Sequence, residues 1–280
     1  MFFLCRNPGA PIWYGDGFLS VIIDSHAHVF PDKIAEKATE SIGDFYSIPM
    51  DLDGSVGTLL KLSEAYGVSR FLIQSVATTP QQVCSINDFI AGTVRQYPEK
   101  FIGFGALHPD FENLEQEIDR ICSLGLKGVK LHPDFQKFEA DSAAAMRLYA
   151  AMEGKLPLLI HAGDKRYGYS HPKRIAHILD AFPKLDVIAA HFGGWSQWNE
   201  AQKWLEGKRV WVDTSSSLYE LSPERARELI SCFGEDYVLF GTDYPMWRVN
   251  EELERFYALG LSEEVQEKIL HKNVERLLHL

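Results

Sequence analysis

The chain has 280 residues, of which 46% are hydrophobic, with a net charge of −11 and a pI of about 5.4. A nucleic-acid-binding face needs clustered basic residues, so this acidic balance argues against nucleic acid as a partner. The apolar runs are too short to span a bilayer, and we expect a cytoplasmic protein that acts on a small molecule. The four cysteines are scattered without a C-x-x-C pair, which is typical of a reduced intracellular protein with buried thiols.

Residues 1–20 contain several prolines and glycines and lack the basic start and cleavage site of a signal peptide. We expect this segment to be an N-terminal arm packed on the domain formed by residues 21–280, or an over-long reading of the start site.

Eight short apolar runs follow, and each is bounded by polar or turn residues. Such runs are typical of parallel strands that are buried on both faces. Most are followed by a segment with helical periodicity, as in 57–67, 114–125, 141–154 and 222–234. This alternation predicts an α/β fold of eight βα units, a (β/α)8 TIM barrel, for which about 250 residues is the usual size. The expected strands are 21–27, 70–76, 101–107, 127–131, 157–161, 186–191, 209–214 and 237–242.

Two regions depart from the repeating pattern. The connection over residues 29–56 is long and irregular, and it leaves the first strand on the side where a barrel builds its active site. This makes it the lid candidate. The segment 250–280 has the pattern of two or three amphipathic helices, and we expect these C-terminal helices to close the barrel.

Histidine and aspartate, which are common metal ligands, recur where the apolar runs end. In the first run, VIIDSHAH, His26 and His28 are two positions apart, so they share one face of a strand. Two neutral imidazoles side by side are a natural pair of ligands for a divalent metal. His161, His191 and Asp243 end the fifth, sixth and eighth runs. Barrel enzymes build their sites at this end of the strands, so the pattern predicts a metal centre there.

Four further residues are candidates for substrate binding. Lys130 and His132 end the fourth run, in GVKLHP, and Arg166 and Tyr167 lie in the loop that follows the fifth strand. Asp24, deeper on the first strand, is either a polar support for a ligand histidine or a group that makes core hydrogen bonds.

The motifs DSHAHVFP, GVKLHP, IHAG, AHFGG and GTDYP, in this order, resemble the amidohydrolase superfamily. The branch is amidohydrolase family 2, which includes relatives of aminocarboxymuconate-semialdehyde decarboxylase and resorcylate decarboxylase. The resemblance covers nearly the whole chain after residue 20. It implies one divalent metal ion; zinc suits the donor set best, Mn²⁺, Fe²⁺ or Co²⁺ would also accept it, and a second metal is less expected. The implied ligands are His26, His28, His161 and Asp243.

The resemblance also implies catalytic roles. Asp243 would accept a proton from metal-bound water, and His191 would be either a ligand of a second metal or an acid/base group. Some members of the superfamily bridge two metals with a carboxylated lysine on the fourth strand. Lys130 is therefore a candidate for that bridge, for substrate binding, or for pairing with a carboxylate.

Such a centre allows two reactions. We expect metal-dependent hydrolysis of an amide, ester or lactone bond in a small, carboxylate-bearing substrate. The alternative is metal-dependent, non-oxidative decarboxylation (or hydration) of a small carboxylic acid. A barrel that has lost its activity and only binds is disfavoured, because every ligand type is present. The sequence allows a homodimer without predicting one.

Overall fold

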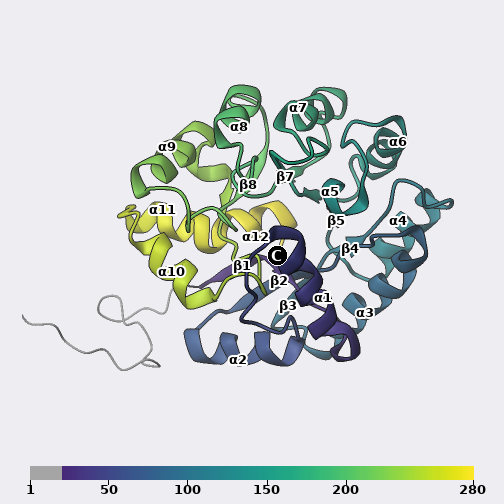
Figure 1. Cartoon of the computed structure of the whole chain (residues 1–280), viewed down its shortest axis with the longest axis horizontal. Helices are drawn as coiled ribbons and strands as arrows, with labels where there is room; N and C mark the ends of the chain where they lie inside the picture. Colours follow the sequence, from purple (N-terminus) through teal and green to yellow (C-terminus); the bar gives the residue numbers. More distant parts are fainter. Residues whose placement is uncertain (1–20) are drawn as a thin grey trace, which may run out of the picture.

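The computed structural model describes residues 21–280, so the expected N-terminal arm lies outside the described residues. Parallel strands form a ring, and helices surround it (Figure 1). The strands are β1 (Ile23–His28), β2 (Arg70–Gln74), β3 (Phe101–Gly103), β4 (Gly105–Ala106), β5 (Val129–Leu131), β6 (Leu158–Ile160), β7 (Val187–Ala189), β8 (Trp211–Asp213) and β9 (Val238–Leu239).

These nine strands occupy eight barrel positions, because β3 and β4 are two halves of the expected strand 101–107. The backbone N–H of Phe104 bonds to Ile73 on β2, whereas that of Gly105 bonds to Gly128 before β5. The first half of this strand therefore pairs with β2, and the second half pairs with β5. The ring closes where the N–H of Ser25 on β1 donates to the carbonyl of Phe240 after β9, at 2.8 Å. The (β/α)8 barrel is confirmed.

Alternation along each strand decides which side chains reach the interior. On β6, Leu158 and Ile160 pack outward in the cluster beneath the helices, and Leu159 packs in the barrel interior. The period of two then places His161 on the interior side as the strand ends. In β1 the register shifts between Asp24 and Ala27. This bulge lets both Ile23, at the bottom, and the two histidines, at the top, face inward.

The helices are α1 (Asp32–Tyr46), α2 (Val56–Tyr66), α3 (Val83–Gln96), α4 (Leu114–Ser123), α5 (Pro133–Gln136), α6 (Ala143–Met152), α7 (Pro172–Ala181), α8 (Trp198–Leu205), α9 (Pro223–Phe233), α10 (Val249–Tyr257), α11 (Glu263–Glu267) and α12 (Asn273–Leu278). Short 3-10 turns cover Pro80–Gln82 and Glu235–Tyr237, and a π-helical turn covers Lys268–Lys272.

The helix ends follow their sequence signals. Ser222 caps α9 by accepting from the N–H of Arg225, with Pro223 as the first helical residue. Gly67 ends α2 in the left-handed conformation. The C-terminal helices close the bottom of the barrel, as expected, since Val274 and Leu277 of α12 pack in the interior cluster.

The sequence suggested that the connection 29–56 is irregular, but the structure shows that it is not. It contains the 15-residue helix α1, which crosses the ring near its centre in Figure 1. The helix signal was weak because the N-cap residue is Pro31, which offers no side-chain hydrogen bond. Ile42 and Tyr46 of α1 line the pocket at the top of the barrel. The helix therefore has the position of a lid.

Two expectations from composition have different outcomes. Within residues 21–280, no helix is both long enough and apolar enough to cross a membrane. The described cysteines form no disulfide, but Cys84 and Cys122 are exposed and Cys232 is half-buried. The expectation of buried thiols is therefore wrong for these three, because they lie on the outer helices rather than on strands.

Candidate metal centre

Three of the four predicted ligands converge at the top of the barrel. The Nε2 atoms of His26 and His28 are 3.2 Å apart, and Asp243 Oδ1 lies 3.3 Å from the first and 3.4 Å from the second. Ligand atoms held about 2.0–2.1 Å from one tetrahedral ion lie about 3.3 Å apart. The three atoms therefore have the spacing of one face of a metal's coordination shell.

The protonation of this group also suits a metal. Burial lowers the pKa of His26 to about 4, and Lys130 adds to this effect, so the ring is neutral. Burial also lowers the pKa of His28. Burial raises the pKa of the Asp243 carboxyl, but the neighbouring histidines together have the larger effect and hold this pKa well below the usual range. Two neutral imidazoles and a carboxylate are the donors that a divalent cation needs, so these residues fit the ion.

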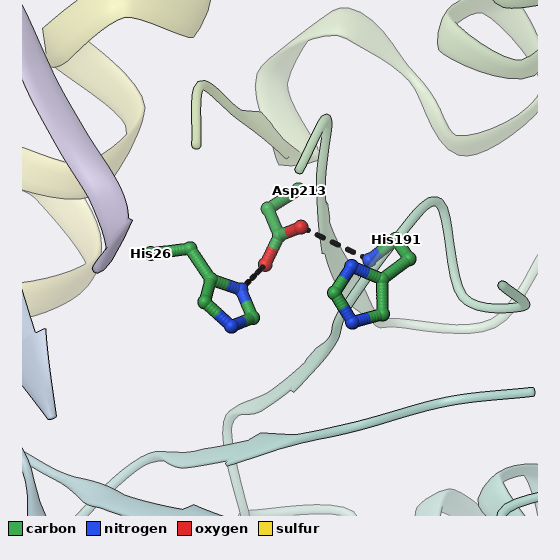
Figure 2. Close-up of side chains that lie close together, drawn as sticks. All are labelled: His26, His191 and Asp213. Atoms are coloured by element: carbon green, nitrogen blue, oxygen red, sulfur yellow. Dashed lines mark hydrogen bonds and ion pairs between the residues drawn. The ribbon is translucent and has the colours of Figure 1, made fainter. Parts of the chain in front are cut away.

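Asp213, which the sequence reasoning missed, holds His26 from behind. Figure 2 shows its carboxylate between His26 and His191. One oxygen accepts from His26 Nδ1 at 2.9 Å, and the other accepts from the backbone N–H of His191 at 2.9 Å. With Nδ1 protonated, His26 presents an unprotonated Nε2 to its neighbours. The signal was present in the sequence, because Asp213 ends the seventh apolar run, VWVD, as the other site residues end theirs.

His161, the fourth predicted ligand, lines the same pocket but faces His191. His161 Nδ1 and His191 Nε2 are 3.0 Å apart. The far nitrogen of His161 donates to the carbonyl of Gly163, and that of His191 donates to the carbonyl of Ser215. We infer from these partners that each ring carries its proton on the far nitrogen. The lone pairs of His161 Nδ1 and His191 Nε2 therefore face each other. A proton between the rings or a cation beside them is required to make this contact favourable.

Lys130 reaches the same group. Its Nζ lies 3.0 Å from His26 Nε2 and donates to the lone pair that a metal would use. Burial lowers the pKa of Lys130 to about 8, although Asp243 and Asp213 act in the opposite direction. A bound ion would displace this contact. Whether Lys130 bridges metals or contacts substrate stays a prediction.

His132 also lies in the pocket, stacked on His161 with ring centroids 4.0 Å apart. The hydroxyl of Tyr46 is 2.8 Å from its Nε2 and connects the lid helix to the site. Sequence reasoning missed Tyr46, because nothing local marks a residue whose role depends on α1 crossing the barrel.

Arg166 and Tyr167, the other predicted substrate residues, are not among the residues that line this pocket. Arg166 pairs with the buried Asp164 and donates to the backbone carbonyl of Phe45, at the end of α1. Tyr167 is 51% exposed and stacks on Phe45. The two residues therefore hold the end of the lid helix in this structure, and their contact with substrate stays a prediction.

Asp24 supports the first strand through its backbone. Its carboxylate accepts from the N–H of His26 at 3.0 Å and from both the N–H and the hydroxyl of Thr242. It thus ties β1 to the loop that carries Asp243, which is a positioning role rather than a bond to a ligand ring.

The backbone at the strand ends is strained. His191, Phe192, Ser216 and Asp243 all have positive φ, between 46° and 63°. For residues other than glycine this conformation costs of order 1–3 kcal/mol each and is found mostly at functional sites. One metal-ligand candidate, Asp243, and one acid/base candidate, His191, are among these residues.

Comparison with known proteins shows the family and the fold of this chain. A family model described as amidohydrolase matches residues 23–280. The γ-resorcylate decarboxylase of Rhizobium radiobacter is 23% identical over 93% of this chain and 98% of its own length. An uncharacterised TIM-barrel protein from Bordetella bronchiseptica has a TM-score of 0.76 at 22% identity, covering 92% of this chain and 98% of that one. A 5-carboxyvanillate decarboxylase from Novosphingobium aromaticivorans, solved with manganese and 4-hydroxy-3-methoxy-5-nitrobenzoic acid, has a TM-score of 0.74 at 19% identity, covering 93% and 96%.

Proposed function

Because the chain belongs to the amidohydrolase family, we propose that it is a metal-dependent, non-oxidative decarboxylase of a hydroxylated aromatic carboxylic acid. Curated relatives from Rhizobium and Polaromonas are all named γ-resorcylate decarboxylase. These names favour the alternative reaction of the sequence analysis over the hydrolase that we expected first.

The observation that carries the proposal is the pair of close nitrogen contacts at the strand ends. His26 Nε2 faces His28 Nε2 at 3.2 Å, and His161 Nδ1 faces His191 Nε2 at 3.0 Å. Buried lone pairs that face each other without a proton or a cation are unfavourable. One divalent ion would take the place of the Lys130 ammonium, which donates to His26 Nε2 at the first pair, and would relieve the second pair, with Asp243 as its carboxylate ligand. Manganese is bound in the relative from Novosphingobium, and the zinc expected from the sequence stays a prediction.

When bound, the ion would hold the substrate's carboxylate and its adjacent hydroxyl oxygen and stabilise negative charge on them. In decarboxylation the ring carbon takes up a proton and its bond to the carboxylate breaks. The electron pair of that bond stays with the ring as CO₂ leaves, so no oxidant or reductant is needed.

The protein's own residues manage the proton. Asp243 is held as a carboxylate, and its second oxygen accepts from the hydroxyl of Ser216 at 2.6 Å. It can therefore take the proton of the substrate's hydroxyl and return it to the ring carbon. His191, whose Nε2 faces the pocket beside His161, is the second candidate for that transfer.

A parallel screen tests the proposal. Protein loaded with Mn²⁺ or Zn²⁺ is incubated with hydroxybenzoates, including 2,6-dihydroxybenzoate and 5-carboxyvanillate, and with a lactone, an aryl ester and an N-acyl amino acid. We expect CO₂ from at least one hydroxybenzoate and loss of that activity with a chelator. Hydrolysis of a member of the second group without CO₂ from any acid would overturn the proposal and restore the hydrolase.

A further inference from the structure

We propose that the groove between α1 and the start of α3 binds an apolar substituent of the aromatic acid, so that the substrate is an aryl carboxylic acid with an alkyl or second aryl group. This inference rests on the proposed function and assigns the class of its substrate.

The first argument is size. The pocket that contains the ligand cluster has a volume of about 20 Å³, which is room for little more than a water molecule or an ion. A neighbouring groove of about 580 Å³ is large enough for an organic molecule. His28, Ile42 and Phe135 line both spaces, so they adjoin at a predicted metal ligand. An acid whose carboxylate lies at the centre has to place the rest of its body in this direction.

The second argument is the character of the walls. Ile34, Ala38, Ile42 and Phe45 are spaced at helical intervals along one face of α1 and line the groove. Only Ala35 and Thr39 of this helix are fully buried. The apolar stripe therefore lies against the groove, and at its end Phe45 also contacts Phe135 and Tyr167.

The opposite wall has matching character. Ile86 and Phe89 of α3, three positions apart, line the groove across from the stripe. The remaining lining mixes apolar side chains, such as Phe30 and Val76, with small polar ones, such as Ser75 and Ser85. Two facing apolar surfaces with few polar groups are typical of a site for a flat or extended hydrocarbon.

The third argument is charge. Among the described residues that line the groove, none is acidic, and Lys37 is the one cation apart from the titratable His28. An anionic acid therefore meets no repulsion along this path, although the chain as a whole has a net charge of −11. The orientation that satisfies both ends of the acid places its carboxylate toward the histidines and its apolar substituent along α1.

Binding of matched acids to the Mn²⁺-loaded full chain tests the inference without requiring turnover. The probes are 2-hydroxybenzoate and its 4-butyl and 5-butyl derivatives, measured by titration calorimetry. Each buried methylene gains roughly fourfold in affinity, so we expect one butyl acid to bind on the order of 100-fold tighter than the parent.

The matched variants are Ala38→Trp, which fills the part of the groove one helical turn beyond Ile42, and Glu36→Trp, on the opposite face of the same helix. We expect Ala38→Trp to abolish the gain from the butyl group and to leave the affinity for 2-hydroxybenzoate unchanged. Glu36→Trp should keep the gain, which controls for the effect of a new tryptophan on the helix.

The outcomes separate this inference from the proposed function. If neither butyl acid binds tighter than the parent, or if both variants behave alike, the groove is not a substituent site, even if CO₂ is released. If the gain is present and Ala38→Trp alone removes it while no acid is decarboxylated, the groove assignment stands and the proposed reaction fails.

Discussion

Replacing Asp213 by asparagine should change the tautomer of His26. One carboxylate oxygen accepts from the backbone N–H groups of His191 and Ser215, at 2.9 and 3.1 Å. The asparagine oxygen has to remain there, so its NH₂ group faces His26 Nδ1. The imidazole must then accept at Nδ1 and carry its proton on Nε2, the atom that lies 3.2 Å from His28 Nε2. A protonated Nε2 cannot bind a metal.

The magnitude follows from two effects. Loss of the hydrogen-bond partner behind a ligand histidine typically costs 10- to 100-fold in metal affinity or activity. Although burial acts in the opposite direction, His26 and His191 lower the pKa of Asp213 to about 2 from an ordinary 3.8. A lowered pKa stabilises the fold above pH 4, and this benefit is lost as pH falls toward 2. At pH 7 Asp213→Asn should therefore cost about 2 kcal/mol of stability.

Titration calorimetry of the metal-free variants with Mn²⁺ measures the first effect, and urea unfolding without metal measures the second. Glu252→Gln is the matched control for the Mn²⁺ titration, because Glu252 is also a buried carboxylate but pairs with Arg255. An Asp213→Asn protein that folds and binds Mn²⁺ as tightly as the wild type would refute the role of Asp213 in fixing the tautomer.

Three further predictions concern the site and the fold. His191→Ala should retain metal by elemental analysis but lose about 10²–10⁴-fold in kcat, the usual contribution of an acid/base group; parallel loss of metal would make His191 a ligand instead. Removal of metal by a chelator should lower the Tm, because a cation at 100 times its Kd stabilises the fold by about 3 kcal/mol; an unchanged Tm would argue against a preformed site. Burial raises the pKa of Glu252 from 4.5 to about 7, against the effect of Arg255. Its stabilising contribution is full below pH 4.5 and lost as pH rises to 7, so urea unfolding should show the wild type losing about 3 kcal/mol over that range relative to Glu252→Gln.

The sequence was most informative where chemistry and strand order coincide. His26, His28 and Asp243 end apolar runs, and parallel strands bring such ends to one edge, so their convergence could be predicted. The same reasoning located His161 and His191 in the pocket, but it could not show that their rings face each other. Ring orientation depends on hydrogen bonds to loop carbonyls, which leave no pattern in the sequence.

Other features depend on tertiary contacts that no local signal reveals. The helix α1 lacks a side-chain cap and has few buried residues, so its 28-residue region resembled an irregular loop. Tyr46 reaches His132 only because that helix crosses the barrel. Arg166 is a typical anion-binding residue by type, yet Asp164 and the end of α1 already engage it here. Residue type alone therefore assigned binding roles less well than position at a strand end.

The most direct test of the central claim is decarboxylation in D₂O followed by NMR. Metal-loaded protein is supplied with the hydroxybenzoate that gives the most CO₂ in the screen, or with 2,6-dihydroxybenzoate if none does. We predict one CO₂ per product molecule and a single deuterium on the ring carbon that lost its carboxylate, with neither product formed by Asp243→Asn. An intact carbon–carboxylate bond in every acid tested, with metal bound at full stoichiometry, would contradict the assignment of this barrel as a decarboxylase.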